Sequence, residues 1–296
     1  MPDTRTHRGP HSEDARLFAP SECQNLLAAV ADLSWLLERG YSTRSALQLV
    51  GNRHQLAARQ RLAVERCACA SSAARLRQMR RVDADRLAGI KLWIDGYNVL
   101  LTTEVALGGG IVLGAVDGTY RDIASVHGTY RTVDETLPAL ERLGREFRRV
   151  GSSGWTWWLD RPVSNSGRLK TIIEELAQRE GWNWNVELVN NPDKTLRDAA
   201  EVIATADSHV LDGTARWYNL ARAVVEQLEP PARVVDLAAA DAPAPRCVSS
   251  NTEVKLNPNL RCESCGAAGA YEWDGAALCL QCYTERGSCC AEREEG

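Results

Sequence analysis

The sequence predicts an α/β fold, a parallel sheet flanked by helices, with an all-helical segment before it and a small metal-binding module after it. Residues 21–79 place apolar side chains at helical spacing, and residues 91–237 alternate short apolar runs with helical patterns. Two CxxC pairs lie near the C-terminal end. We therefore expect four segments: a helical domain (1–88), an α/β domain (89–237), a linker (238–250) and a zinc module (251–296).

The composition is that of a soluble globular protein, with 44% apolar and 25% charged residues among 296. No apolar run approaches the roughly 18 residues of a membrane span. The N-terminal residues lack the apolar stretch of a signal peptide. We expect a cytoplasmic protein with no membrane partner.

Charge is distributed unevenly along the chain. The formal net charge is −4, yet residues 1–90 carry 14 arginines, no lysine and 9 acids. Eight arginines accompany a single acid, Glu65, in the third predicted helix (54–79) and its borders: Arg53, Arg59, Arg61, Arg66, Arg75, Arg77, Arg80 and Arg81. Arginines on a helix can contact phosphates, so nucleic acid is an expected partner. The alternatives are a solvated helix face, or one that docks on the acidic remainder of the chain.

The α/β segment begins with the apolar run Lys91–Asp95. Further strands are predicted at Trp155–Leu159, Trp184–Val189, Val202–Ala206 and Arg233–Leu237. Helices are predicted at Val133–Val150, Gly167–Glu180 and Thr214–Glu229. The glycine-rich stretch from Val105 to Arg121 is typical of a β-hairpin inserted after the first strand.

Acids follow four of the predicted strands. They are Asp95, Asp160, Asp193 and Asp207, and Asp212 lies five residues further on. Because parallel strands end at one edge of a sheet, these carboxylates are expected to converge on one crevice. The alternative is that each aspartate only caps the turn after its strand.

Converging carboxylates repel one another unless a cation neutralises them, and oxygen ligands suit Mg²⁺ or Mn²⁺. Such a metal can activate a water and stabilise the charge on a phosphodiester. We expect Asp95, Asp207 and Asp212 to be metal ligands, with Asp160 and Asp193 holding a second ion or orienting the water. This chemistry predicts a nuclease.

The segment from Pro162 to Gly167 leads from a strand into a helix, whose free N–H groups could receive phosphate. The candidate substrate-binding residues there are Ser164, Asn165, Ser166, Arg168 and Lys170. The alternative is simple helix capping.

Two cysteine knuckles predict a structural zinc site. Cys262 and Cys265 form the first pair, and Cys279 and Cys282 form the second. Four thiolates complete a closed tetrahedron, as in a zinc ribbon or treble-clef finger, and Gly266 permits the tight turn. The remaining cysteines receive no role: Cys23, Cys67, Cys69, Cys247, Cys289 and Cys290.

The stretch IDGYNVL (94–100) resembles the opening motif of the PIN-like and NYN nucleases, and TADSHVLD (205–212) is similar to their last acidic motif. This resemblance implies that Asp95 and Asp207 ligate metal and that Asn98 steadies the turn. The family's acid on a middle helix has three candidates here: Asp134, Glu135 and Asp198. The whole chain resembles domain-of-unknown-function family 434, in which a helical domain precedes a PIN-like domain.

Three functions follow from these features. The first is metal-dependent cleavage of RNA. The second is non-catalytic binding of nucleic acid or the ribosome through the zinc module and the basic helices. The third is a phosphatase or phosphotransferase that acts on a small molecule. The sequence leaves the substrate and the choice between RNA and DNA open.

Overall fold

The computed structural model describes residues 7–124, 130–238, 257–273, 276–279 and 282. The chain divides into two compact units, Met1–Ala242 and Pro243–Gly296. The helical and α/β segments therefore belong to one unit, and the cysteine-rich segment belongs to the other. Apart from its first residue, the predicted linker over 238–250 lies outside the described residues.

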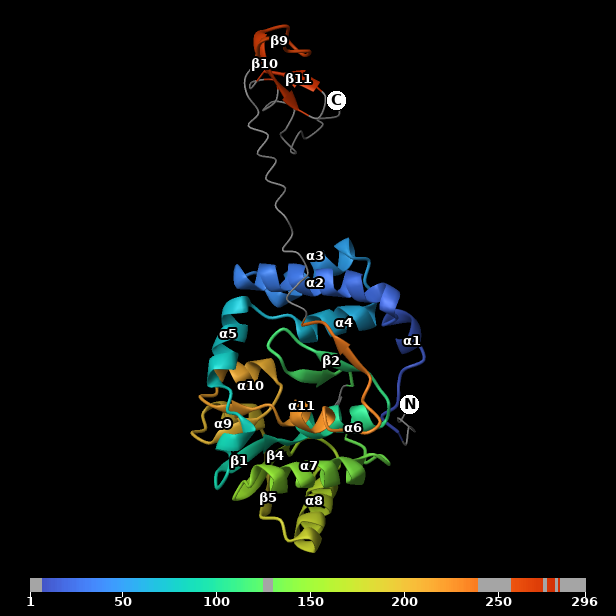
Figure 1. Ribbon diagram of the computed structural model, residues 1–296, viewed down its shortest axis with the longest axis vertical. Coiled ribbons are helices and arrows are strands. Elements are labelled where there is room, and N and C mark those ends of the chain that lie inside the picture. The colour runs from blue at the N-terminus through green and yellow to red at the C-terminus, as the bar shows by residue number, and fades with distance from the viewer. Residues whose placement is uncertain (1–6, 125–129, 239–256, 274–275, 280–281, 283–296) are drawn as a thin grey trace. The chain divides into compact units, whose positions relative to one another are not determined.

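The larger unit contains a sheet of five parallel strands in the order β5–β4–β1–β6–β7, of which Figure 1 labels β5, β4 and β1. Its strands are β1 (Lys91–Asp95), β4 (Gly154–Asp160), β5 (Trp184–Val189), β6 (Val202–Ala204) and β7 (Trp217–Tyr218). The predicted parallel sheet is confirmed. Because β1 pairs with β4 on one side and β6 on the other, Asp95 ends the central strand.

Helices cover both faces of this sheet. On one face lie α6 (Gly96–Leu107), α7 (Thr136–Val150), α8 (Ser166–Glu180) and α11 (Leu220–Val225), and on the other α9 (Pro192–Arg197) and α10 (Ser208–Gly213). Alternate residues of β1 pack on opposite faces of the sheet. Leu92 and Ile94 belong to the larger core, whereas Trp93 packs on Trp158 on the other face, with ring centroids 4.6 Å apart.

A second, smaller sheet has the order β3–β2–β8. Its strands are β2 (Val112–Gly114), β3 (Tyr120–Asp122) and β8 (Val234–Asp236). The strand predicted at 233–237 therefore pairs with β2 and not with the main sheet. The predicted hairpin occupies 112–122, because residues 96–107 form helix α6 instead of leading straight into it.

The N-terminal segment is helical, as predicted. Its elements are α1 (Asp14–Leu17), α2 (Pro20–Glu38), α3 (Thr43–Arg53), α4 (Ala58–Cys67), α5 (Ser71–Arg80) and a short 3₁₀ helix, η1 (Ala84–Arg86). The single helix predicted over 54–79 is two helices, because the chain is extended after Cys67 and the hairpin residue Val116 donates its N–H to the Cys67 carbonyl at 2.9 Å. Leu33 of α2 and Leu113 of β2 share one core, so these helices pack on the small sheet.

The second unit contains an antiparallel sheet in the order β11–β10–β9. Its strands are β9 (Asn257–Arg261), β10 (Ala268–Trp273) and β11 (Ala276–Leu278). No helix in the described part of the chain is long and apolar enough to cross a membrane.

Candidate functional site

Asp95 is almost completely buried, with 8% of its surface exposed. It ends β1 just where α6 begins, so its carboxylate lies at the carboxyl edge of the sheet. The Thr205 hydroxyl donates a hydrogen bond of 2.7 Å to Asp95 Oδ2. Thr205 follows β6, so the neighbouring strand fixes the orientation of the carboxylate.

The surroundings of Asp95 disfavour its ionised form. Burial, above all, raises the pKa of Asp95 to about 7, and the carboxylates of Asp207, Asp193 and Asp160 raise it further, while the hydrogen bond from Thr205 opposes this shift. All four strand-end acids predicted from the sequence therefore act on one another at the same edge of the sheet.

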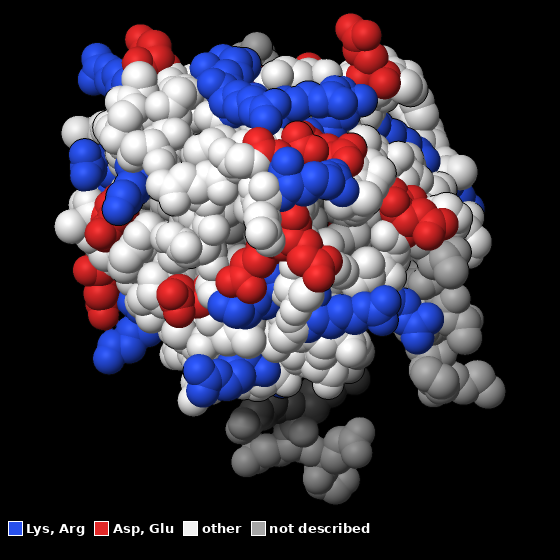
Figure 2. Space-filling model, turned by 90° about the horizontal axis from the view of Figure 1, so that it is seen from below, with Lys and Arg blue, Asp and Glu red and all other residues white. Residues whose placement is uncertain are grey.

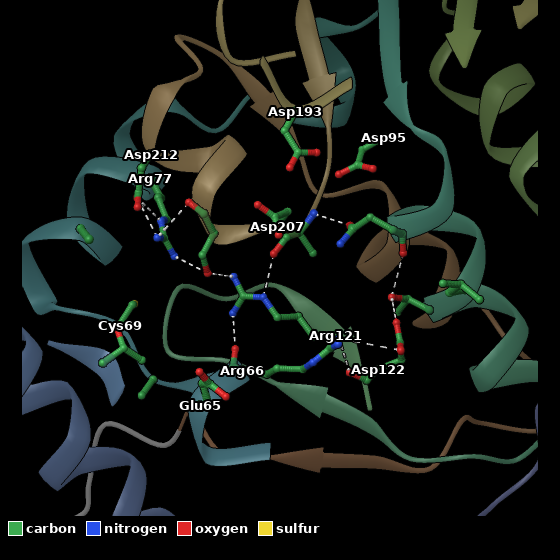
Figure 3. A pocket seen from close by; sticks show the side chains of 18 of the residues that line it. Glu65, Arg66, Cys69, Arg77, Asp95, Arg121, Asp122, Asp193, Asp207 and Asp212 are labelled. Carbon is green, nitrogen blue, oxygen red and sulfur yellow. Dashed lines mark hydrogen bonds and ion pairs between the residues drawn. The ribbon is translucent and has the colours of Figure 1, made fainter. Parts of the chain in front are cut away.

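A cavity of about 720 Å³ lies beside Asp95 (Figure 3). Asp95, Asp193 and Asp207 lie along one side of it, and Arg66 and Arg121 lie on the opposite side. Residues of α4, α5 and their connection also line it. The helical segment and the α/β segment thus build the cavity together, which neither segment's sequence pattern predicts.

Asp207 faces the cavity and also forms hydrogen bonds through both its side chain and its backbone N–H group. Its Oδ1 accepts hydrogen bonds from the backbone N–H groups of His209 (2.8 Å) and Val210 (3.0 Å), so it caps α10. Its own N–H donates to Thr205 Oγ1 at 2.9 Å. The capping alternative therefore holds for Asp207, yet its Oδ2 makes no hydrogen bond to the described residues. Asp193, in the first turn of α9, points into the same space (Figure 3).

Asp160 and Asp212 are placed differently. Asp160 ends β4, where partial burial and the Asp193 carboxylate raise its pKa, but it does not line the cavity. Asp212 does line the cavity, and its Oδ1 lies 2.7 Å from a guanidinium nitrogen of Arg77. The charge of Asp212 is therefore already neutralised by a protein cation.

The donor set around Asp95 consists of oxygen atoms, which suits Mg²⁺ or Mn²⁺. Within the described residues, the four cysteines of the second unit form the only group of three or more potential ligands whose ligand atoms lie within 4.8 Å of one another. The acids thus share a cavity without forming a closed cage. Mg²⁺ is commonly held by one or two carboxylates, with water and substrate oxygens completing its shell, so the arrangement fits that ion.

Asn98, which the resemblance marks as a turn residue, lies in the first turn of α6. Its Oδ1 accepts a 2.7 Å hydrogen bond from the N–H of Ala206. This contact ties the end of β1 to the segment that precedes Asp207. Asn98 also lines the cavity.

The predicted phosphate-binding segment lies elsewhere. None of its five residues lines the cavity: Ser164, Asn165, Ser166, Arg168 and Lys170. Asn165 is the N-cap residue of α8, and its side-chain amide donates to the Tyr130 carbonyl at 2.8 Å. The Lys170 ammonium donates to the Val186 carbonyl and pairs with Glu174. This segment makes internal contacts next to the α8 N-terminus.

Asp122 is a buried acid of the cavity that the strand-end pattern missed. It ends β3, accepts a 3.0 Å hydrogen bond from Thr102 and lies 3.9 Å from the Arg66 guanidinium. Burial raises the pKa of Asp122, against the opposing effects of Arg66 and Thr102. The only signal in the sequence is an acid at the end of a short strand-like run, as at Asp95.

The three candidates for a middle-helix acid do not line the cavity: Asp134, Glu135 and Asp198. Glu135 accepts hydrogen bonds from the His7 ring (3.0 Å) and from the backbone N–H of Arg8 (3.2 Å). Asp134 lies 3.2 Å from the same imidazole.

The four predicted zinc ligands meet in the second unit. The thiol sulfurs of Cys262, Cys265, Cys279 and Cys282 lie within 4.8 Å of one another, and the Cys265–Cys279 distance is 3.6 Å. A tetrahedron with Zn–S bonds of about 2.3 Å has sulfur atoms about 3.8 Å apart, so the group fits a structural zinc ion. Gly266 has a φ of 73° and donates its N–H to the Cys262 carbonyl, which makes the first knuckle.

Among the described residues, the other cysteines form no such group. Cys67 and Cys69 are buried, and burial raises the pKa of Cys67 to about 12 and of Cys69 to about 11, which favours the protonated thiol at both positions. Cys23 is half-buried. Cys247, Cys289 and Cys290 lie outside the described residues.

Two protein families match adjacent segments of the chain. "Protein of unknown function (DUF434)" matches residues 25–80, and "Domain of unknown function (DUF5616)" matches residues 84–223. The resemblance to family 434 therefore covers the helical segment alone, and the α/β segment resembles a second uncharacterised domain family. An uncharacterised protein of Methanocaldococcus jannaschii is 29% identical over 183 residues, which cover 62% of this chain and 87% of that relative. No solved structure matches.

Proposed function

We propose that this protein is a divalent-metal-dependent nuclease that cleaves RNA at the Asp95 cavity. The position of Asp95 carries the proposal, because it is buried at the end of the central strand with other carboxylates around it. A group whose ionised form is so disfavoured gains free energy when a cation binds beside it.

Asp95 and Asp207 are the residues that would hold Mg²⁺ or Mn²⁺. Thr205 contacts both, donating to Asp95 Oδ2 and accepting from the N–H of Asp207, so it sets their relative position. When bound, the ion supplies an activated water and neutralises charge on the phosphodiester. Asp193, at the same side of the cavity, would orient that water or hold a second ion.

A PIN-like identity for the α/β domain is part of the proposal. The parallel sheet, the acid at the end of its central strand and the IDGYN motif support it. The Asn98 contact with Ala206 agrees with the turn-steadying role that the resemblance implies.

RNA is the proposed partner on the basis of charge in residues 1–90. Some of these arginines form ion pairs within the protein: Arg59 pairs with Asp14, and Arg77 pairs with Asp117. On the face seen in Figure 2, basic and acidic side chains are interspersed. RNA binding would therefore depend on arginines that remain at the surface, such as Arg44 of α3.

A small phosphorylated substrate is the second candidate. The cavity volume, about 720 Å³, lies within the range of about 300–1,000 Å³ typical of small-molecule sites. A phosphatase would use the same acids, so the two candidates differ in substrate and not in chemistry.

Cleavage assays with the full chain test the proposal. Purified wild type and Asp95→Asn are compared on single-stranded and structured RNA, and on p-nitrophenyl phosphate, with Mg²⁺, Mn²⁺ or chelator. Asn keeps the shape of the side chain and removes its charge, so cleavage should fall by at least about 100-fold while the fold is retained.

Equal RNA cleavage by both proteins would point to contamination and contradict the proposal. Turnover of the phosphate monoester alone would favour the small-substrate candidate. RNA binding without cleavage of any substrate would favour the non-catalytic role.

A further inference from the structure

Arg77 of α5 is 3% exposed, which is rare for an arginine. Its guanidinium makes three kinds of contact with distant parts of the chain. It donates to Asp117 Oδ2 (2.6 Å), to Asp212 Oδ1 (2.8 Å) and to the backbone carbonyl of Ser208 (3.2 Å). A residue of the helical segment is thus bound both to α10, the helix that follows β6, and to the turn between β2 and β3.

Arg121 of β3 is buried beside it. It donates to the same Asp117 oxygen (2.6 Å), to the Ala206 carbonyl (2.7 Å) and to the Arg66 carbonyl (2.7 Å). Asp117 therefore joins the two guanidinium groups. Against the effect of burial, the Arg121 guanidinium, the hydrogen bond from Thr119 and the Arg77 guanidinium lower the pKa of Asp117 to about 2, which favours its ionised form.

The two arginines hold the residues on either side of Asp207. Arg121 binds the Ala206 carbonyl and Arg77 binds the Ser208 carbonyl. Neither guanidinium contacts the Asp207 carboxylate in the described structure. Both therefore fix the backbone from which that carboxylate projects into the cavity.

We propose that Arg77 and Arg121, joined by Asp117, are positioning residues that set the Asp207 carboxylate for metal binding. The inference rests on the proposed function, and it gives the helical segment a role in the site of the α/β domain. Residues that orient a metal ligand affect metal affinity as well as stability, commonly by about 10- to 100-fold in affinity. A purely structural ion pair affects stability alone.

Arg77→Lys separates these roles. Lysine keeps a positive charge for Asp117 but lacks the planar fork that reaches Asp212 and Ser208 together. The matched control is Arg75→Lys, the same change at an exposed position of the same helix. Mn²⁺ affinity is measured by electron paramagnetic resonance on the zinc-loaded full chain, and melting temperature is measured in parallel.

We expect Arg77→Lys to raise the Kd for Mn²⁺ about tenfold or more, and Arg75→Lys to leave it unchanged. Arg121→Lys, which releases Ala206 but keeps a charge beside Asp117, should act in the same direction and provides the test if Arg77→Lys does not fold. A lower melting temperature with unchanged Mn²⁺ affinity would overturn this inference alone. Absence of Mn²⁺ binding in the wild type would overturn the proposed function and this inference with it.

Discussion

The folded environment of Asp95 disfavours the ionised form of its carboxyl group. Its pKa is about 7 in the folded protein, against an ordinary value of 3.8. Between these pH values the folded state binds a proton that the unfolded chain has released. The free energy of unfolding therefore falls as pH rises through this window, and the loss is complete above about pH 7.

Asp95→Asn should remove this pH dependence. Each unit of pKa shift corresponds to about 1.4 kcal/mol, so with chelator present the variant should exceed the wild type in stability by a few kcal/mol at pH 8. Near pH 4 the two should be similar. Urea unfolding at both pH values measures the difference.

The exposed acid Asp85 provides the control, because Asp85→Asn should not alter the pH dependence. If the difference in the free energy of unfolding between wild type and Asp95→Asn were the same at pH 4 and pH 8, the raised pKa assigned to Asp95 would be contradicted.

Residues within one motif could be predicted from the sequence, whereas partners far apart could not. Asp95 and Asn98 stand together in a strand-to-turn pattern, and strand ends meet at one edge of a sheet. Asp122 has only the weak signal of an acid at the end of a short strand-like run, and Arg77 has no local signal. Arg77 meets Asp212 across 135 positions of sequence, and only the folded chain brings them together.

At the scale of elements, four strands of the main sheet were predictable because strands covered on both faces are continuous apolar runs. The fifth, β7 (Trp217–Tyr218), lies within the stretch predicted as the helix Thr214–Glu229, of which only Leu220–Val225 forms a helix, α11. Helix α6 was missed because it is buried almost all round, so no polar stripe marks its period. The local sequence pattern could not predict that β8 belongs to the small sheet, because its partner β2 lies more than 100 residues earlier in the chain.

A prediction at this scale concerns the zinc content of the two cysteine knuckles in the second unit. Wild type should contain about one zinc ion per chain, and Cys265→Ser should lose it, because a closed tetrahedral site needs all four thiolates. Zinc content is measured by mass spectrometry. Eight of the nine tryptophans belong to the larger unit, and their fluorescence should be unchanged, because that unit is compact by itself.

Cys23→Ser is the matched control, since Cys23 lies outside the four-cysteine group. Equal zinc in Cys265→Ser and wild type would exclude the assigned site. A large fluorescence change on zinc loss would show that the larger unit depends on the metal.

At the scale of the whole molecule, the cavity joins segments that the sequence divides into two domains. The helical segment shares a core with the small sheet, and its residues line the cavity beside Asp95. Some arginines of the predicted basic surface instead make contacts within the protein. Arg77 is buried, and the half-buried Arg66 donates to the Asp122 carbonyl. The number of arginines in a segment does not show whether they lie free at the surface or make contacts within the protein.

The most direct measurement of the central claim is anomalous scattering from crystals of the full chain soaked in Mn²⁺. The account predicts a manganese peak in the cavity within bonding distance, about 2.2 Å, of the Asp95 carboxylate, and its loss in Asp95→Asn crystals. Manganese bound elsewhere on the chain, with the cavity empty at saturating Mn²⁺, would contradict the claim that these acids form a metal site.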